Sequence, residues 1–160
     1  MQNESRLFIE EIPMIRGSFR AVTQSIKPRA MGGLKMTANG SLKNRNRPSL
    51  RKYDTSISFS DLRAPALDRI FEGDLLTVHC VYELSGDAGQ AFGRPHVPGS
   101  VIWWDAEGNF VPSMSDETEA PVGAISYTYC PILVTRVESW DGDDDEYGAL
   151  VSGTLNLKEA

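Results

Sequence analysis

Hydrophobic and polar residues alternate most regularly between residues 53 and 60. The positions expected on one face of this segment are Tyr53, Thr55, Ile57 and Phe59, and those on the other face are Asp54, Ser56, Ser58 and Ser60. Successive side chains of a β-strand point to opposite faces of a sheet. The pattern therefore predicts a strand with one buried face and one polar face.

Other apolar segments have the length of strands and are separated by turn-forming residues. These segments are 7–12 and 14–22, which Pro13 separates, followed by 75–84, 100–105, 125–140 and 149–157. The first two read as an opening strand pair or as one bent strand. Pro131 should break the long segment 125–140, because proline cannot donate a backbone hydrogen bond. We expect the last two segments to form a terminal hairpin across an acidic turn.

One segment favours a helix. Residues 65–72 have Pro65 in the first turn and Gly73 just past the end, as short helices often do. With one short helix among many strands, the expected fold is mainly β, either a β-sandwich or a small barrel.

Residues 23–52 are expected to form a long basic loop or arm. Pro28, Gly32, Gly33 and Pro48 lie among basic and polar side chains, and Asn39-Gly40 is a strong tight-turn signal. Ordered loops of this length in compact domains are usually functional, so this one could lie on a neighbouring subunit. We therefore expect a single β domain over residues 1–160 with an extended arm at about 23–52.

Length and composition fit a folded protein. The chain has 160 residues, of which 41% are hydrophobic and 24% are charged. No apolar run approaches the roughly 20 residues of a membrane-spanning helix, and the first residues show no signal-peptide pattern. We expect a soluble protein made in the cytoplasm, with Cys80 and Cys130 as buried free thiols in a reducing compartment.

Charge is divided along the chain, although the formal net charge is −6. No acidic residue occurs between Ile12 and Tyr53, whereas the basic residues there are Arg16, Arg20, Lys27, Arg29, Lys35, Lys43, Arg45, Arg47, Arg51 and Lys52. From Asp105 onward the balance reverses and includes the acidic run 141–146. If the two charges lie at opposite ends, copies could stack head to tail, because complementary potentials fix the register of association. A solvated basic loop and a solvated acidic turn are the alternative.

The basic stretch raises the possibility of nucleic-acid binding, since phosphates are neutralised by clustered Lys and Arg. Proteins that bind single strands interleave aromatic residues for base stacking, and residues 27–52 contain none. We therefore do not expect nucleic acid to be the primary partner.

Residues that could carry chemistry do not form a recognisable constellation. His79, Cys80, His96 and Cys130 lack the spacing of a zinc module, and His79 and Cys80 should face opposite sides of a strand. Asp116 and Glu119 lie in a loop without distinctive spacing, and the glycine pairs lack a phosphate-loop lysine. We expect no catalytic residue, no metal, no cofactor and no enzyme activity.

Two binding alternatives remain open at this point. Asp141, Asp143 and Asp145 alternate as in a calcium loop, but Glu146 stands where an EF-hand has glycine. Trp103 and Trp104 alternate across a strand, so one should lie in the core while the other could face a partner or a sugar.

Two stretches together resemble small structural proteins of tailed-phage virions, in the tail-tube and distal-tail families. The first is residues 51–68 continuing through 73–80, and the second comprises Tyr129-Cys-Pro-Ile-Leu, Trp140 with the acidic turn, and Leu155-Asn-Leu-Lys-Glu. The resemblance covers about half of the chain. It implies a β-sandwich or barrel subunit that forms rings, and it brings no catalytic or ligand residue with it.

The resemblance implies a virion protein whose main partner is itself, in a stacked ring of six subunits, together with other virion tail proteins. It implies no membrane, and DNA only as passing cargo. In such a stack Arg45, Arg47, Arg51 and Lys52 would meet the acidic residues of the next ring, which are Asp143, Asp144, Asp145 and Glu146. The rival roles are a capsid decoration protein, a head-to-tail connector, or a carbohydrate- or calcium-binding β-sandwich module.

Overall fold

Antiparallel strands make up most of the computed structural model, which describes residues 5–113 and 115–160. Residues 1–4, on which the expected lack of a signal peptide partly rests, lie outside this range. The strands are β1 (Phe8–Ile9), β2 (Val22–Pro28), β3 (Leu34–Met36), β4 (Leu42–Asn44), β5 (Tyr53–Asp61), β6 (Leu75–His79), β7 (Leu84–Asp87), β8 (Ile102–Trp104), β9 (Phe110–Val111), β10 (Ser126–Tyr129), β11 (Ile132–Asp143) and β12 (Val151–Glu159). A 3₁₀ turn, η1 (Pro48–Leu50), precedes β5. The expected mainly β fold is confirmed.

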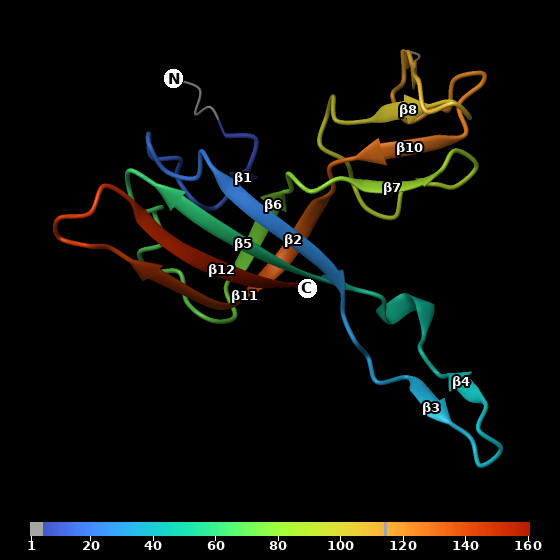
Figure 1. Ribbon diagram of the computed structural model, residues 1–160, viewed down its shortest axis with the longest axis horizontal. Coiled ribbons are helices and arrows are strands. Elements are labelled where there is room, and N and C mark those ends of the chain that lie inside the picture. The colour runs from blue at the N-terminus through green and yellow to red at the C-terminus, as the bar shows by residue number, and fades with distance from the viewer. Residues whose placement is uncertain (1–4, 114) are drawn as a thin grey trace.

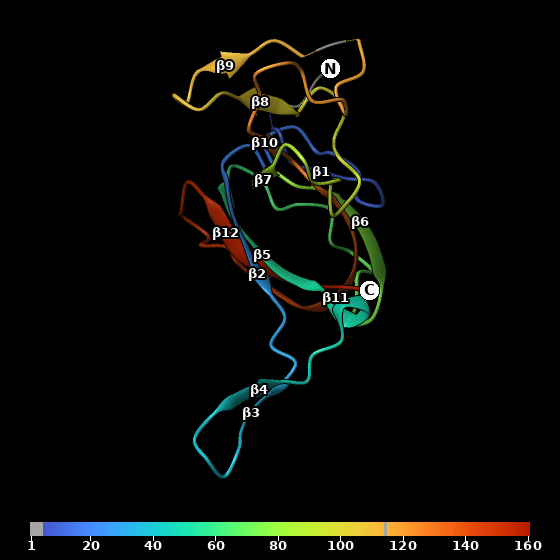
Figure 2. The same cartoon turned by 90° about the vertical axis from the view of Figure 1, so that its right-hand side faces the viewer.

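The larger sheet has six strands in the order β1-β6-β11-β12-β5-β2 and curls into a half-barrel (Figure 2). Its inner face holds the main core, in which Ile57, Leu133 and Leu155 are almost fully buried. The alternation seen in the sequence explains this arrangement, because Thr55, Ile57 and Phe59 of β5 all face inward. The serines between them face outward.

The second sheet has four strands in the order β7-β10-β8-β9 and its own aromatic cluster. The ring of Phe92 lies 4.8 Å from that of Tyr129 and 4.6 Å from that of Tyr127, and Trp103 is 1% exposed. As expected, Pro131 breaks the long apolar segment, so that β10 belongs to this sheet and β11 to the half-barrel. The terminal hairpin of β11 and β12 also forms as expected.

The hairpin of β3 and β4 projects from the half-barrel as an arm (Figure 1). Its tip is the expected tight turn, in which the Gly40 amide donates to the Thr37 carbonyl at 2.9 Å. Gly40 has a φ of +79°, a conformation that glycine adopts without steric cost. The arm begins later than expected, because residues 23–28 belong to β2, where Gln24 and Ile26 point towards the core side.

The expected helix at 65–72 is wrong, because these residues form turns. The Leu67 amide donates to the Pro65 carbonyl and the Ile70 amide to the Leu67 carbonyl, so no helical ladder develops. Arg69 has a φ of +64°, and the Ile70 carbonyl accepts a bond from the Trp140 indole. Burial of Leu67 in the core outweighs the helical preference of so short a segment.

The opening segments also differ from the expectation. Only Phe8–Ile9 of the segment 7–12 is a strand, and residues 14–21 form turns in place of a second strand. The apolar side chains of Leu7, Ile12 and Phe19 are nevertheless buried in the main core. Hydrophobic burial is thus satisfied there without strand pairing.

The expected strand 75–84 is shorter than its apolar run. β6 ends at His79, and Leu84 already begins β7 in the other sheet. Between them, the amides of Val81 and Tyr82 donate to the side-chain oxygen of Gln24 at 2.8 and 3.1 Å. This amide side chain replaces strand pairing across the open side of the half-barrel.

Candidate assembly surfaces

The arm has one apolar face and one basic face. In the register of β3 and β4, Met36 pairs with Leu42 and Lys35 pairs with Lys43, so the apolar and basic side chains lie on opposite faces. Leu34, Met36 and Leu42 are 65%, 72% and 67% exposed. A two-stranded hairpin is marginally stable alone in water. The arm therefore presents a surface that a further protein surface would stabilise.

The arm also carries a strong local charge. Residues 29–52 contain seven basic residues and no acidic one. Among the described residues, only Arg29 of this set pairs with a carboxylate, that of Asp54 at 2.9 Å. Arg45, Arg47 and Arg51 are exposed, and Lys52 is half-buried. Of these four cations, which were expected to face another subunit, Arg45, Arg47 and Arg51 are at the surface without an Asp or Glu partner in the described chain, and Lys52 donates to the Ala160 oxygen.

A network around Glu159 fixes the root of the arm to both sheets. Arg94, from the loop after β7, forms an ion pair with Glu159 and donates to the Arg51 carbonyl at 3.0 Å. The Tyr53 amide donates to Glu159 at 2.7 Å, and the Arg94 guanidinium lies 5.2 Å from the centre of the Tyr53 ring. The hydrogen bonds that the Arg94 guanidinium donates to the Glu159 carboxylate raise the pKa of Arg94 above its ordinary value. The arm root is therefore a rigid platform.

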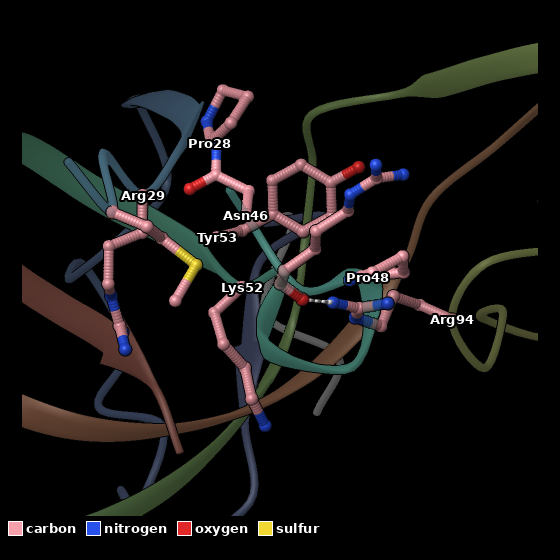
Figure 3. A pocket seen from close by; sticks show the side chains of 9 residues that line it. Pro28, Arg29, Asn46, Pro48, Lys52, Tyr53 and Arg94 are labelled. Carbon is pink, nitrogen blue, oxygen red and sulfur yellow. Dashed lines mark hydrogen bonds between the residues drawn. The ribbon is translucent and has the colours of Figure 1, made fainter. Parts of the chain in front are cut away.

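A pocket of about 480 Å³ opens at this root (Figure 3). It is lined by Pro28, Arg29, Met31, Asn46, Pro48, Arg51, Lys52, Tyr53 and Arg94. In Figure 3 the charged ends of Arg29 and Lys52 point away from the Tyr53 ring. The lining thus combines apolar surface with a rim of positive charge.

The acidic turn lies at the tip of the β11–β12 hairpin. The Gly148 amide donates to the Asp145 carbonyl at 2.8 Å, which places Glu146 and Tyr147 at the apex. Tyr147 is 92% exposed. No ion pair joins any acidic residue of 141–146 to a cation in the described part of the chain. The second set of expected contact residues, Asp143 to Glu146, is therefore also at the surface and unneutralised.

The two charged surfaces do not meet within the chain. Figure 1 shows the β11–β12 turn at one end of the longest axis and the β3–β4 arm at the other end. One molecule therefore carries a positive and a negative surface at opposite ends. This is the arrangement that head-to-tail stacking of copies would require.

The other residues considered for chemistry do not gather at one site. His79 pairs with Glu10 at 2.9 Å on the outside of the sheet, while Cys80 is buried. His96 lies elsewhere and pairs with Glu117 at 2.7 Å. In the part of the chain that the structure describes, no three His, Cys, Asp or Glu side chains are placed to hold one metal ion.

Both cysteines are free and buried. Burial raises the pKa of the Cys80 thiol to about 12 and also raises that of Cys130. A thiol with such a pKa is almost entirely protonated near neutral pH and is a poor nucleophile. The environment of Cys80 is that of a core residue.

The two tryptophans divide as expected. Trp103 is buried in the aromatic cluster and donates to the Glu117 carbonyl at 3.1 Å. Trp104 is half-buried and donates to Thr128 at 3.2 Å.

Asp116 is bonded to Thr118, which lowers the pKa of this carboxyl, and Glu119 is exposed in the same loop. Within the described residues, no helix is long and apolar enough to cross a membrane.

The sequence interpretation missed three features of these surfaces: the exposed Tyr147, the pocket, and the Arg94–Glu159 network. Tyr147 had a detectable signal, because it directly follows a run of acidic residues. The contacts of Arg94 had no signal in the sequence, since Arg94 is far along the chain from both Tyr53 and Glu159.

No protein-family model, curated protein or solved structure matches this chain.

Proposed function

We propose that the protein is a self-assembling structural protein of a phage virion, in the role of a tail-tube or related tail component that forms stacked rings. The observation that carries the proposal is the placement of an unneutralised basic arm and an unneutralised acidic turn at opposite ends of one molecule. A contact between unlike surfaces on two copies is heterologous, and it repeats along a ring or a stack. The resemblance of residues 51–80 to tail proteins gives the assembly its biological setting.

Sheet edges supply a second kind of contact in this picture. β1 and β2 are the end strands of the six-stranded sheet, so each has one edge without a strand partner in the described chain. Pairing of such edges between subunits would extend the curled sheet into a larger closed ring and would remove an aggregation liability. Ring closure through edges and stacking through charge are then separate interactions.

Electron microscopy of the purified protein and its mass in solution, at low and high salt, test the proposal together. Salt screens exposed charges over a Debye length of about 8 Å at physiological ionic strength. Rings or tubes that loosen with added salt are expected. A monomer at every salt and protein concentration would overturn the proposal, and a capsid lattice position would move the protein to a decoration role.

A charge-reversal variant sharpens this test. Arg45 and Arg47 are exposed and have no ion-pair partner among the described residues. The double variant R45E/R47E should lower the assembled fraction and leave the melting temperature of the subunit unchanged. The matched control is Arg63→Glu, an exposed arginine outside the arm, which should assemble as the wild type does.

A further inference from the structure

We propose that Tyr147 of one copy inserts into the pocket at the arm root of a second copy, with the carboxylates around it meeting the cationic rim. This inference rests on the proposed self-assembly and names the contact that directs it. It makes the interface a knob at the tip of the β11–β12 hairpin and a socket where the arm leaves the half-barrel, at two separate places on each molecule (Figure 1).

The knob is unusual for a surface residue. A tyrosine at the apex of a hairpin turn, 92% exposed, gains nothing from its own fold. Tyrosine is enriched among residues that dominate binding energy, because it buries a large rigid surface at a small cost in conformational entropy. The acidic residues that flank it, Asp143, Asp144, Asp145 and Glu146, form no ion pair within the described chain.

The socket has the complementary chemistry. Pro28, Met31, Pro48 and Tyr53 provide apolar and aromatic surface, and methionine sulfur contacts aromatic rings favourably. Asn46 offers a polar group that a tyrosine hydroxyl can bond. The volume of about 480 Å³ lies in the range of pockets that hold one compact ligand group.

The pocket also carries positive charge, which an ordinary apolar pocket does not. Of the four cations in the lining, Arg29 is paired with Asp54 and Arg94 with Glu159. Arg51 and Lys52 have no Asp or Glu partner among the described residues, although Lys52 donates to the Ala160 carbonyl at 2.5 Å. They are available to the carboxylates that surround an inserted Tyr147.

Two variants test the proposal, one that removes the knob and one that alters the socket. Tyr147→Ala removes the knob, and Arg51→Glu reverses the charge at the socket. The Arg51 carbonyl, and not its side chain, accepts the bond from Arg94, so the platform should survive the second substitution. Each variant alone should raise the protein concentration needed for assembly at least about tenfold, as a central interface residue does.

The mixture is the decisive sample. Because Arg51→Glu keeps its knob and Tyr147→Ala keeps its socket, equal amounts of the two should form a complex that contains both variants in a one-to-one ratio and does not stack further. Analytical ultracentrifugation measures its mass. An interface between like surfaces would give no such complementation and would overturn the inference.

Three controls separate the outcomes. Tyr147→Phe keeps the ring and should still assemble, and Tyr82→Ala, which truncates a 43% exposed tyrosine on the body, should assemble normally. Unchanged melting temperatures exclude misfolding. If the wild type assembles and Tyr147→Ala assembles equally well, the knob-and-socket contact is wrong while self-assembly stands. If the wild type never assembles, the proposed function itself fails.

Discussion

Asp61 joins the end of β5 to the chain entering β2. Its carboxylate is 5% exposed and accepts bonds from the Arg20 guanidinium at 2.7 Å and from the backbone amides of Arg20 and Leu62 at 3.0 and 2.7 Å. The hydrogen bonds from the Arg20 side chain are the largest influence, and they hold the pKa of Asp61 well below its ordinary value despite burial. The ionised form is therefore bound more tightly in the folded state than in the unfolded chain.

We predict that Asp61→Asn lowers the free energy of unfolding by about 2 kcal/mol, since hydrogen bonds to a charged group contribute about 1.5–3 kcal/mol each and Arg20 is partly screened by solvent. A depressed pKa contributes stability above the unfolded value, near 3.9, that is lost as the pH falls towards the folded value. Urea unfolding between pH 7 and pH 3 measures both effects. The wild type should lose more stability below pH 4 than the variant does. Exposed Asp68→Asn is the control, and an equal loss there would refute the assignment.

Individual strands show why sequence reasoning succeeded in some places and failed in others. β5 could be predicted because one buried face imposes a period of two over nine residues. Residues 14–21 and 65–72 are apolar for another reason, since side chains such as Phe19 and Leu67 fill the core from irregular turns. Periodicity carries no information about such burial. The short-helix signal at Pro65 failed because local propensity is weaker than packing.

The candidate surfaces could be predicted only in part. The basic arm and the acidic turn are visible as charge runs in the sequence, and the Asn39-Gly40 turn shows that the arm folds back on itself. The pocket depends on Arg94 approaching Tyr53, two residues that only the pairing of distant strands brings together. The separation of the charged surfaces to opposite ends is likewise a property of the topology.

The arm is the element whose state should change most on assembly. It contributes no residue between 29 and 52 to either hydrophobic core, so little holds its projecting part beyond the bonds at the root. It also contains Lys35, Lys43 and Arg45, which are exposed and are trypsin sites, whereas Pro48 protects the bond after Arg47. Local opening of a segment with few buried contacts costs little free energy.

We predict that brief trypsin treatment of the monomer cuts first after Lys35, Lys43 or Arg45 and leaves the two flanking parts associated. The assembled form should be cut there at least about tenfold more slowly, because burying the arm adds about 1.4 kcal/mol or more to the cost of opening. Mass spectrometry of early digests locates the cut. Cleavage at Arg136 in β11 is the internal reference, since a strand inside the sheet should resist in both forms. Equal cutting of the arm in both forms would show that assembly leaves it uncovered.

On the scale of the whole molecule, the division of charge determines which surface a nucleic acid would meet. The net charge is −6, and most cations of residues 12–53 lie on or near the arm. The outer face of β5 and β12 combines neutral polar groups, such as Ser56, which donates to Asn156 at 2.9 Å, with Asp54 and Lys158, whose opposite charges balance. Outside residues 29–52 the chain has nine basic and 22 acidic residues, so the surface that remains once a neighbouring copy covers the arm is acidic on balance. Such a surface repels phosphates rather than retaining them.

We predict that assembled wild-type protein does not retain double-stranded DNA at physiological salt, whereas a subunit with a free arm binds it weakly. The variant Tyr147→Ala, kept below its assembly concentration, supplies that free arm. Its binding should fall steeply with salt, by roughly 0.9 in log affinity per log unit of salt for each phosphate contacted. Co-sedimentation with the assembly measures whether DNA is retained. A salt titration of the variant measures how its affinity for DNA depends on salt. R45E/R47E in the same Tyr147→Ala background should bind DNA less, since it removes two of the cations. Tight, salt-sensitive retention of DNA by the assembly itself would instead make the arm a nucleic-acid contact and would remove the charge argument for stacking.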